Sequence, residues 1–399
     1  MAKRIKALVE PSLLVWARET ASLPLEEAAR AIGVPAEQVE AWERGEGEPS
    51  IPQLKKVANA YKRPLPVFFL PEPPTEFQPL RDFRRLSDAG ERPYSAKLAF
   101  EVRAAQERRA IALDVIASLG EPPTEFGIKA SVRDNPETVA KRVRERLGVT
   151  LEQQSRWGEP DKAFKAWREA IEAVGVLVFA LSGAHHQVPL SEVRGFAIAE
   201  QPLPAIVVNS KDRTNGRIFT LLHELGHVVL GTSAIENDLE PPATLPAPAR
   251  AIETFCNRLA AAVLMPRDAL LVEPLVTAKA RTGSEWTDAE IGALARRYCV
   301  SREAMLVRLV ELGCADRAFY QAKRAEYAKQ YEEIEDDSEG GGFAPYQYQI
   351  LSHVGRGFAR LVLQGYYQNR LTLSTVSGYL GTQAKHVPNI ERATFNVSA

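Results

Sequence analysis

Two histidines and a glutamate near the middle of the chain are spaced for metal chemistry. The segment HELGH, residues 223–227, separates its histidines by four positions, and residues four apart on an α-helix lie about 40° from each other around the axis. His223 and His227 should therefore project from one face and bind one ion. Glu224 lies about 100° further round, where it reaches a water on that ion rather than the ion itself. The pattern predicts a metal site with Glu224 as general base, and the alternative is a pair of surface or core histidines.

A third protein ligand is needed, because a catalytic zinc ion usually has three and keeps one position open for water. Glu253 is the best candidate, since it lies early in the next predicted helix and a Pro/Ala loop gives the chain room to turn back. The competing ligands are Glu236, Asp238, Glu240 and Cys256. Solvation is the simpler explanation for the three acids in the connection, and the thiol is readily explained as a small buried hydrophobe.

Other polar side chains have weaker cases for a role at this site. Asn257 follows Glu253 by four residues, so its amide could accept the outer N–H of a ligand histidine, or it could simply lie on the helix surface. The sequence does not identify the group that stabilises an oxyanion. The candidates are His185, His186 and Tyr298, and each is as readily explained as a structural residue.

The elements that must position these residues follow from hydrophobic periodicity. Three short runs rich in β-branched residues predict strands at 174–181, 193–199 and 204–209. Apolar residues at helical spacing predict one helix over 216–231, which contains HELGH, and a second over 248–266. The run PAIVVN, directly before the first helix, is a candidate edge strand that holds an extended substrate by backbone pairing. We expect an α+β fold, mostly helical, with a small three-stranded sheet.

The same segments resemble a known family of enzymes. PAIVVNSKDRTNGRIFTLLHELGHVVLG, followed by ETFCNRLAAAVLMP, is similar to the ImmA/IrrE metallopeptidases, and the resemblance covers about 160–315. It implies a zincin-like, gluzincin-type metalloendopeptidase domain that holds one Zn²⁺ ion per chain, with another divalent ion as an alternative. By this resemblance His223, His227 and Glu253 are the metal ligands and Glu224 is the catalytic base.

Two residues depart from the pattern of that family. Cys256 stands where alanine is usual, and Leu259 stands where an aromatic residue is common. Both are conservative changes of a helix interior, and neither touches a proposed ligand. Similar proteins cut a helix-turn-helix repressor once and thereby derepress a stress, mobile-element or DNA-damage regulon. The resemblance therefore implies a protein substrate of this class.

A second pattern lies near the start of the chain, in LEEAARAIGVPAEQVEAWERG, residues 25–45. Ala29 is followed four positions later by Gly33 and six further on by Val39, a spacing that lets two helices pack closely around a turn. With PSIPQLKKVANAY, this segment resembles the XRE/Cro-type DNA-binding domain over about 10–70. The resemblance implies a helix-turn-helix bundle with its recognition helix at 35–43.

The expected DNA contacts are few. Gln38 is best suited to a base edge, and Glu37 could accept a hydrogen bond from cytosine. Phosphate contacts are expected from a cluster of basic residues, namely Lys55, Lys56, Lys62 and Arg63. Because residues 1–70 hold about as many acids as bases, a protein-docking helical domain is the alternative to a DNA reader.

The composition of the whole chain limits the classes of function. Its 399 residues carry 50 Lys and Arg against 51 Asp and Glu, so any DNA contact must be local. Three cysteines, Cys256, Cys299 and Cys314, provide no disulfide framework, which is typical of a reducing compartment. No apolar run approaches the ~18 to 20 residues of a membrane span. We expect a cytoplasmic protein with no membrane partner.

Changes in composition predict four parts. They are a helix-turn-helix domain at 1–72, a Pro-containing linker and helical brace at 73–160, an ImmA/IrrE-like metallopeptidase domain at 161–333 and a C-terminal helical region at 343–399. Within the last part, 371–391 weakly resembles a second helix-turn-helix, and a helical cap on the peptidase domain is the alternative that we favour.

Together these features predict a zinc-dependent, site-specific endopeptidase that regulates transcription by cleaving a helix-turn-helix repressor or a similar partner. The alternative is a DNA-binding transcriptional regulator or an antitoxin-like protein, paired with a toxin encoded nearby, whose metal site is structural or senses a ligand. Glu224 favours the enzyme, because a purely structural site needs no carboxylate beside its first histidine.

Overall fold

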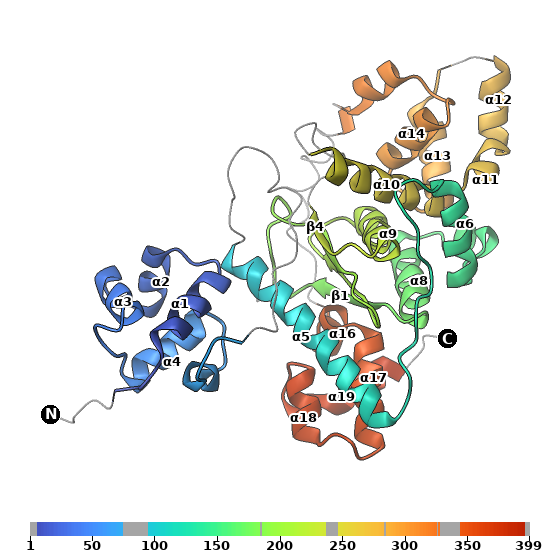
Figure 1. The fold of residues 1–399 in the computed structure, drawn as a ribbon. Helices are drawn as coiled ribbons and strands as arrows, with labels where there is room; N and C mark the ends of the chain where they lie inside the picture. The colour runs from blue at the N-terminus through green and yellow to red at the C-terminus, as the bar shows by residue number, and fades with distance from the viewer. Residues whose placement is uncertain are drawn as a thin grey trace. The chain divides into compact units, whose positions relative to one another are not determined.

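The computed structural model describes residues 6–74, 95–183, 186–236, 246–282, 285–324, 326–327 and 344–395. The chain divides into two compact units (Figure 1). The N-terminal unit comprises 1–80 and 88–107, and the main unit comprises 81–87 and 108–399. The four-part division expected from the sequence stays a prediction. None of the described helices has the length and apolar composition that crossing a bilayer requires.

The N-terminal unit is a bundle of short helices. They are α1 (Pro11–Thr20), α2 (Leu25–Ile32), α3 (Ala36–Glu43) and α4 (Ile51–Ala60), followed by the 3-10 helix η1 (Leu65–Phe69). Gly33 ends α2 in a left-handed conformation with φ 78°, so α3 starts in a new direction. Ala29 and Val39 are buried in the core that α2 and α3 share. The predicted helix-turn-helix spacing is confirmed.

One long helix, α5 (Ala96–Leu119), crosses the boundary between the units in sequence, since the division falls between residues 107 and 108. In the N-terminal unit, Arg103 donates a hydrogen bond to the carbonyl of Thr20. In the main unit, Arg109 donates from Nε to the carbonyl of Leu203 at 3.0 Å and from Nη2 to Glu200 and Pro202. Each half of α5 is thus anchored by a half-buried arginine in its own unit.

The main unit is built around a four-stranded sheet with the order β1-β3-β2-β4. The strands are β1 (Leu177–Leu181), β2 (Gly195–Ile198), β3 (Ala205–Asn209) and β4 (Ala234–Glu236). β1 is parallel to β3, and β2 is antiparallel to both β3 and β4. The three predicted strands are confirmed, and the short β4 adds a fourth.

The expectation that PAIVVN, directly before the helix that carries HELGH, is an edge strand is wrong. That segment is β3, which pairs with β1 on one side and with β2 on the other. Both of its backbone edges are therefore occupied, and it has none to offer a substrate. In the described sheet the outer strands are β1 and β4.

Helices cover both faces of the sheet at β1. Val178 and Ala180 join the main core with Trp167 of α8 (Pro160–Ala173), together with residues of α9 (Thr214–Leu230). Because side chains alternate along a strand, Phe179 faces the other way, and its ring packs edge-on against Phe358 at 6.2 Å. Figure 1 shows α9 running beside the strands and next to α10 (Ala247–Leu264).

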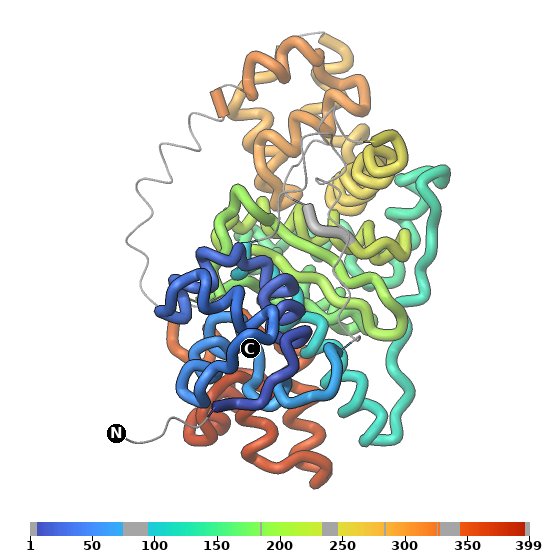
Figure 2. The backbone as a smooth tube through the Cα atoms, turned by 60° about the vertical axis from the view of Figure 1, so that its left-hand side comes forward, coloured from blue at the N-terminus to red at the C-terminus, as the bar shows by residue number. Residues whose placement is uncertain are grey.

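The remaining helices flank this core. α6 (Pro136–Leu147) and α7 (Leu151–Arg156) precede α8, and α11 (Arg267–Leu271), α12 (Pro274–Thr282), α13 (Asp288–Tyr298) and α14 (Arg302–Glu311) follow α10. The helices from α10 to α14 gather in one region, drawn in yellow and orange in Figure 2. The C-terminal region is helical as predicted, with α16 (Tyr346–Val354), α17 (Arg356–Tyr367), α18 (Leu373–Tyr379), η4 (Ala384–His386) and α19 (Val387–Phe395).

The C-terminal helices are tied to the outer strand β1 by buried polar contacts. His353 donates from Nδ1 to the carbonyl of Ala180 at 2.8 Å. Arg168 donates to the carbonyls of Val178 at 2.6 Å and of Ser352 at 3.2 Å. These bonds satisfy backbone groups on the open side of the sheet, so the region has the geometry of a helical cap on the main unit.

The buried His353 makes stability depend on pH. Burial, reinforced by the nearby guanidinium of Arg108, lowers the pKa of His353 to about 2. In the unfolded chain this histidine binds a proton below about pH 6.5, whereas in the folded chain it stays neutral. Its full contribution to the free energy of unfolding is therefore present above about pH 6.5 and is lost as the pH falls. Relative to His353→Gln, the wild type should lose up to about 1.4 kcal/mol of unfolding free energy per pH unit below about 6.

Denaturant unfolding of both proteins at about pH 7.5 and about pH 5 measures this difference. Glutamine still offers a donor to Ala180, so the comparison isolates the titration. Parallel pH profiles for the two proteins would contradict the assignment.

Candidate metal centre

The helix that carries HELGH is largely buried, since 11 of the 17 residues of α9 lie in the core. α9 ends at Gly231, which takes a left-handed conformation with φ 66°, as the sequence indicates. His223 is 5%, Glu224 1% and His227 0% exposed. Polar side chains this deep in a core need partners or a ligand, so the position itself points to a functional role.

Three ligand atoms converge in this core. The Nε2 atoms of His223 and His227 are 3.1 Å apart, and Oε2 of Glu253 is 3.3 Å from the first and 3.6 Å from the second. In a tetrahedral zinc site with bonds of about 2.0 to 2.1 Å, ligand atoms are separated by about 3.3 to 3.4 Å. The three separations bracket this value, and the donor set of two imidazoles and a carboxylate is one that zinc uses with a fourth position left open. The residues present therefore fit a zinc ion.

The close approach of α9 and α10 depends on a glycine. A Cβ on Gly226 would lie 3.0 Å from Sγ and 3.1 Å from Cα of Cys256, which is tighter than most real contacts and would push the two helices apart by a few tenths of an ångström. Without a side chain at this position, α10 packs directly on the backbone of α9 and brings Glu253 to the histidines. Gly226 of HELGH thus allows the close approach of α9 and α10.

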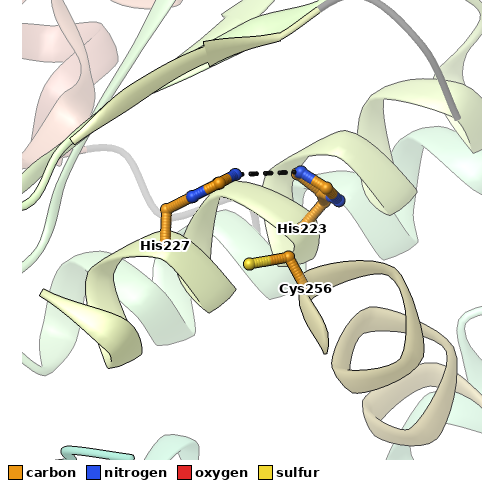
Figure 3. A group of neighbouring side chains, drawn as sticks. All are labelled: His223, His227 and Cys256. Atoms are coloured by element: carbon orange, nitrogen blue, oxygen red, sulfur yellow. Dashed lines mark hydrogen bonds between the residues drawn. The ribbon is translucent and has the colours of Figure 1, made fainter. Parts of the chain in front are cut away.

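Cys256 itself lies at the edge of the centre. Its Sγ is within 4.8 Å of ligand atoms of both histidines, and Figure 3 shows it projecting from α10 beneath the pair. The side chain is fully buried, and the same sulfur fills the contact at Gly226. This packing matches the interpretation of the thiol as a small buried hydrophobe.

Asn257 orients one of the two histidines. The Nδ1 atom of His223 lies 2.8 Å from Oδ1 of Asn257. An amide oxygen only accepts, so the proton is on Nδ1 and the lone pair of Nε2 points to the centre. Such an outer contact fixes both the tautomer and the angle of the ring.

The side chain of Glu224 extends from α9 towards Gly195, the first residue of β2. A Cβ on Gly195 would come 3.1 Å from Oε1 of Glu224 and 2.6 Å from Cγ2 of Thr220. The contact with Thr220 excludes a side chain at this position, and its absence also leaves space for the glutamate. Gly195 is not among the site residues predicted from the sequence. A glycine near the start of the strand predicted at 193–199 is the feature that could have indicated a close approach of another element.

The other site candidates are engaged elsewhere or lie outside the described residues. The hydroxyl of Tyr298 donates to Glu273 at 2.9 Å, and burial raises the pKa of this tyrosine. The ring of His186 stacks on His353 at 3.7 Å. His185, Asp238 and Glu240 lie outside the described residues, as does the side chain of Glu236.

The predicted DNA-contacting residues lie on the surface of the N-terminal unit. Glu37 and Gln38 are on α3, exposed and half-buried respectively, and Lys55 and Lys56 are exposed on α4. The expected basic cluster is smaller than predicted, because Arg63 packs inward. Its guanidinium donates to Thr20 at 2.8 Å and lies 4.3 Å over the ring of Trp16, and burial lowers the pKa of Arg63 to about 10.

Part of the acidity of α3 is also neutralised within the unit. Arg18 of α1 donates two hydrogen bonds to Glu43, at 2.7 and 2.9 Å. Arg44 pairs with Glu40 at 3.0 Å and with Glu46 at 3.1 Å. Glu37 is the acidic residue at the exposed start of α3, whereas Glu40 and Glu43 are paired with arginines. The repulsion between α3 and DNA phosphates is therefore weaker than the sequence suggests.

Comparisons with known proteins agree with both patterns. Residues 171–310 match a peptidase family model described as IrrE N-terminal-like domain, and residues 14–68 match a helix-turn-helix model. The chain thus carries an IrrE-like peptidase domain and an N-terminal helix-turn-helix domain, as the resemblances predict.

Two curated relatives share part of the chain. The radiation response metalloprotease IrrE of Deinococcus deserti is 35% identical over 138 residues, which cover 34% of this chain and 44% of the relative. The protein of the same name from Deinococcus radiodurans is 34% identical over 107 residues, which cover 27% and 30%. The shared segment spans less than half the length of either relative. No solved structure gives a significant match.

Proposed function

We propose that this protein is a zinc-dependent, site-specific endopeptidase that regulates transcription by cleaving a helix-turn-helix repressor or a similar partner. The observation that carries the proposal is the convergence of His223, His227 and Glu253, with separations of 3.1 to 3.6 Å between their ligand atoms. The match to a peptidase family and the metalloprotease names of the relatives support the same class of reaction.

Each residue of the centre has a defined task. His223, His227 and Glu253 hold the ion, and Asn257 keeps the Nε2 lone pair of His223 directed at it. When bound, zinc is a Lewis acid that polarises a peptide carbonyl and lowers the pKa of a water ligand towards about 7. The carboxylate of Glu224 accepts the proton of the attacking water and passes it to the leaving amine.

The rival is a regulator whose metal site is structural or sensory. Glu224 is the feature that separates the two, because it is buried beside the ligands without being one of the three convergent donors. A carboxylate held in that place serves proton transfer and adds nothing to a purely structural site. The proposed substrate is a protein with a helix-turn-helix domain, since the chain carries the same type of module.

The direct test is to incubate the zinc-loaded protein with helix-turn-helix regulators encoded next to its own gene. A single cut in one of them, located by mass spectrometry and prevented by a chelator, is the expected result. Loss of the repressor's promoter binding should accompany the cut. If none of these regulators is cut, and the affinity of the protein for DNA differs between its metal-loaded and metal-free forms, the sensory alternative replaces the proposal.

We also propose that the N-terminal unit binds DNA. The affinity of the full chain for its own promoter should fall steeply with salt, because Lys55 and Lys56 contact phosphates. Replacing both lysines with alanine should reduce the slope of log affinity against log salt by about 2, whereas Gln38→Ala should reduce discrimination between promoter and scrambled DNA. Lys129→Ala, an exposed change in the main unit, is the matched control.

Fluorescence anisotropy at several salt concentrations gives both quantities. If binding does not depend on sequence or salt, the N-terminal unit is a protein-docking module instead.

A further inference from the structure

A cavity of about 480 Å³ lies at the start of α9, beside the turn between α13 and α14. Its volume is within the range of about 300 to 1,000 Å³ that is typical of small-molecule sites. Five basic side chains contribute to its wall, against two acidic ones. The basic residues are Arg194, Lys211, Arg213, Arg296 and Arg302.

These charges come from segments far apart in the sequence. Arg194 directly precedes β2, Lys211 and Arg213 lie between β3 and α9, and Arg296 and Arg302 lie on either side of the α13–α14 turn. Gly292 shows how close the last two come, since a Cβ there would lie 3.5 Å from Nη1 of Arg296 and 3.9 Å from Cδ of Arg302. Like charges gathered at one cavity raise its positive potential and attract anions.

The two acids of the wall offset only part of this charge. Asp212 accepts from Arg194 at 2.8 Å and from the backbone N–H of Arg213 at 2.8 Å, so its carboxylate is already held by the protein. Arg302 lies 5.2 Å over the ring of Tyr327. Among the described residues, Lys211 and Arg296 form no ion pair. The side chains of these two residues are therefore available to bind an anionic ligand.

We propose that this cavity binds a small anion with two or more phosphate groups. Guanidinium groups match phosphate oxygens with paired hydrogen bonds, and several cations around one cavity suit a ligand with several negative charges. The described lining contains no aromatic ring on which a nucleobase would stack. The phosphates, and not a base, are therefore the recognised groups, whether they belong to a nucleotide or to a sugar.

The cavity is separate from the metal centre although α9 serves both. Gly216, which lines the cavity, precedes His223 by seven residues, or about 10.5 Å along the helix. Arg194 is joined directly to Gly195, the residue that makes room for Glu224. The site requires no metal and does not depend on the proposed peptidase activity.

The test is isothermal titration of the full-length, zinc-loaded protein with fructose 1,6-bisphosphate, which binds zinc weakly, and with ADP and inorganic phosphate for comparison. We expect one bisphosphate per chain, and at least about tenfold weaker binding for the variant that carries both Lys211→Ala and Arg296→Ala. The matched control carries Lys129→Ala and Arg142→Ala, which removes two exposed charges elsewhere in the main unit. Thermal melts and zinc content verify that all proteins are intact.

Similar affinities for ADP and the sugar bisphosphate indicate recognition of phosphates alone, and tighter binding of either one identifies the source. No binding of either compound, equal losses in the cavity and control variants, or uptake of inorganic phosphate that is the same in all proteins would overturn the proposal.

Discussion

Replacing Glu224 with glutamine is expected to leave the zinc content unchanged and to lower peptide-bond cleavage by about 10²- to 10⁴-fold, the usual contribution of a general base. Glutamine has the size of glutamate, so it fits the space beside Gly195, but it does not accept a proton from water. Metal analysis of the purified variant and the cleavage rate of the partner repressor measure the two quantities separately.

Glu152→Gln, an exposed change on α7, is the control for loss of one negative charge. If Glu224→Gln cleaves the partner as fast as the wild type, the proposed mechanism is wrong. If it loses zinc instead, Glu224 is a ligand and its role must be reassigned.

Glu253→Gln is expected to weaken zinc binding by more than about 100-fold, since even outer-shell partners contribute about 10- to 100-fold. The amide is a poor zinc ligand and leaves two imidazoles, which do not complete a stable site. Competition with a chromogenic chelator gives the affinity. The same titration with cobalt reports the coordination directly through the visible spectrum.

Cys256→Ala, one helical turn further on, is the matched variant for this experiment. It removes the competing sulfur but keeps the carboxylate, so zinc affinity should stay near that of the wild type. A large loss of zinc affinity in Cys256→Ala, with little change of zinc affinity in Glu253→Gln, would identify Cys256 and not Glu253 as the third ligand.

Local spacing predicts part of the candidate centre. The four-residue separation of His223 and His227 fixes their common face on any α-helix, and the apolar pattern around them is long enough to be unambiguous. Asn257 followed from the helical period of the next segment, whereas Glu253 was one of several candidate ligands and was singled out by its place early in that segment and by the family resemblance. The pairs His223 and His227, and Glu253 and Asn257, each depend on geometry within one helix, which the sequence encodes directly, whereas the approach of the two helices depends on tertiary packing.

Contacts between distant segments could not be predicted in the same way. β4 has three residues, too few for a period, and the central place of β3 depends on how strands pair across the sheet. The inward turn of Arg63 and the gathering of five basic residues at one cavity likewise depend on tertiary packing. Composition gives the charges but not their neighbours.

The near-complete burial of His223, Glu224, His227 and Glu253 restricts what form of polypeptide reaches them. In an α-helix the peptide bonds lie inside a cylinder that is about 10 to 12 Å wide with its side chains, whereas an extended chain exposes its peptide bonds along the backbone. If the proposed cleavage takes place, a folded partner would have to unwind at the bond to be cut or present that bond in a linker. Under the proposed function, the frequency of that local opening in the partner would govern how fast the partner is cut, and a signal that loosens the partner would raise the cleavage rate without any change in this protein.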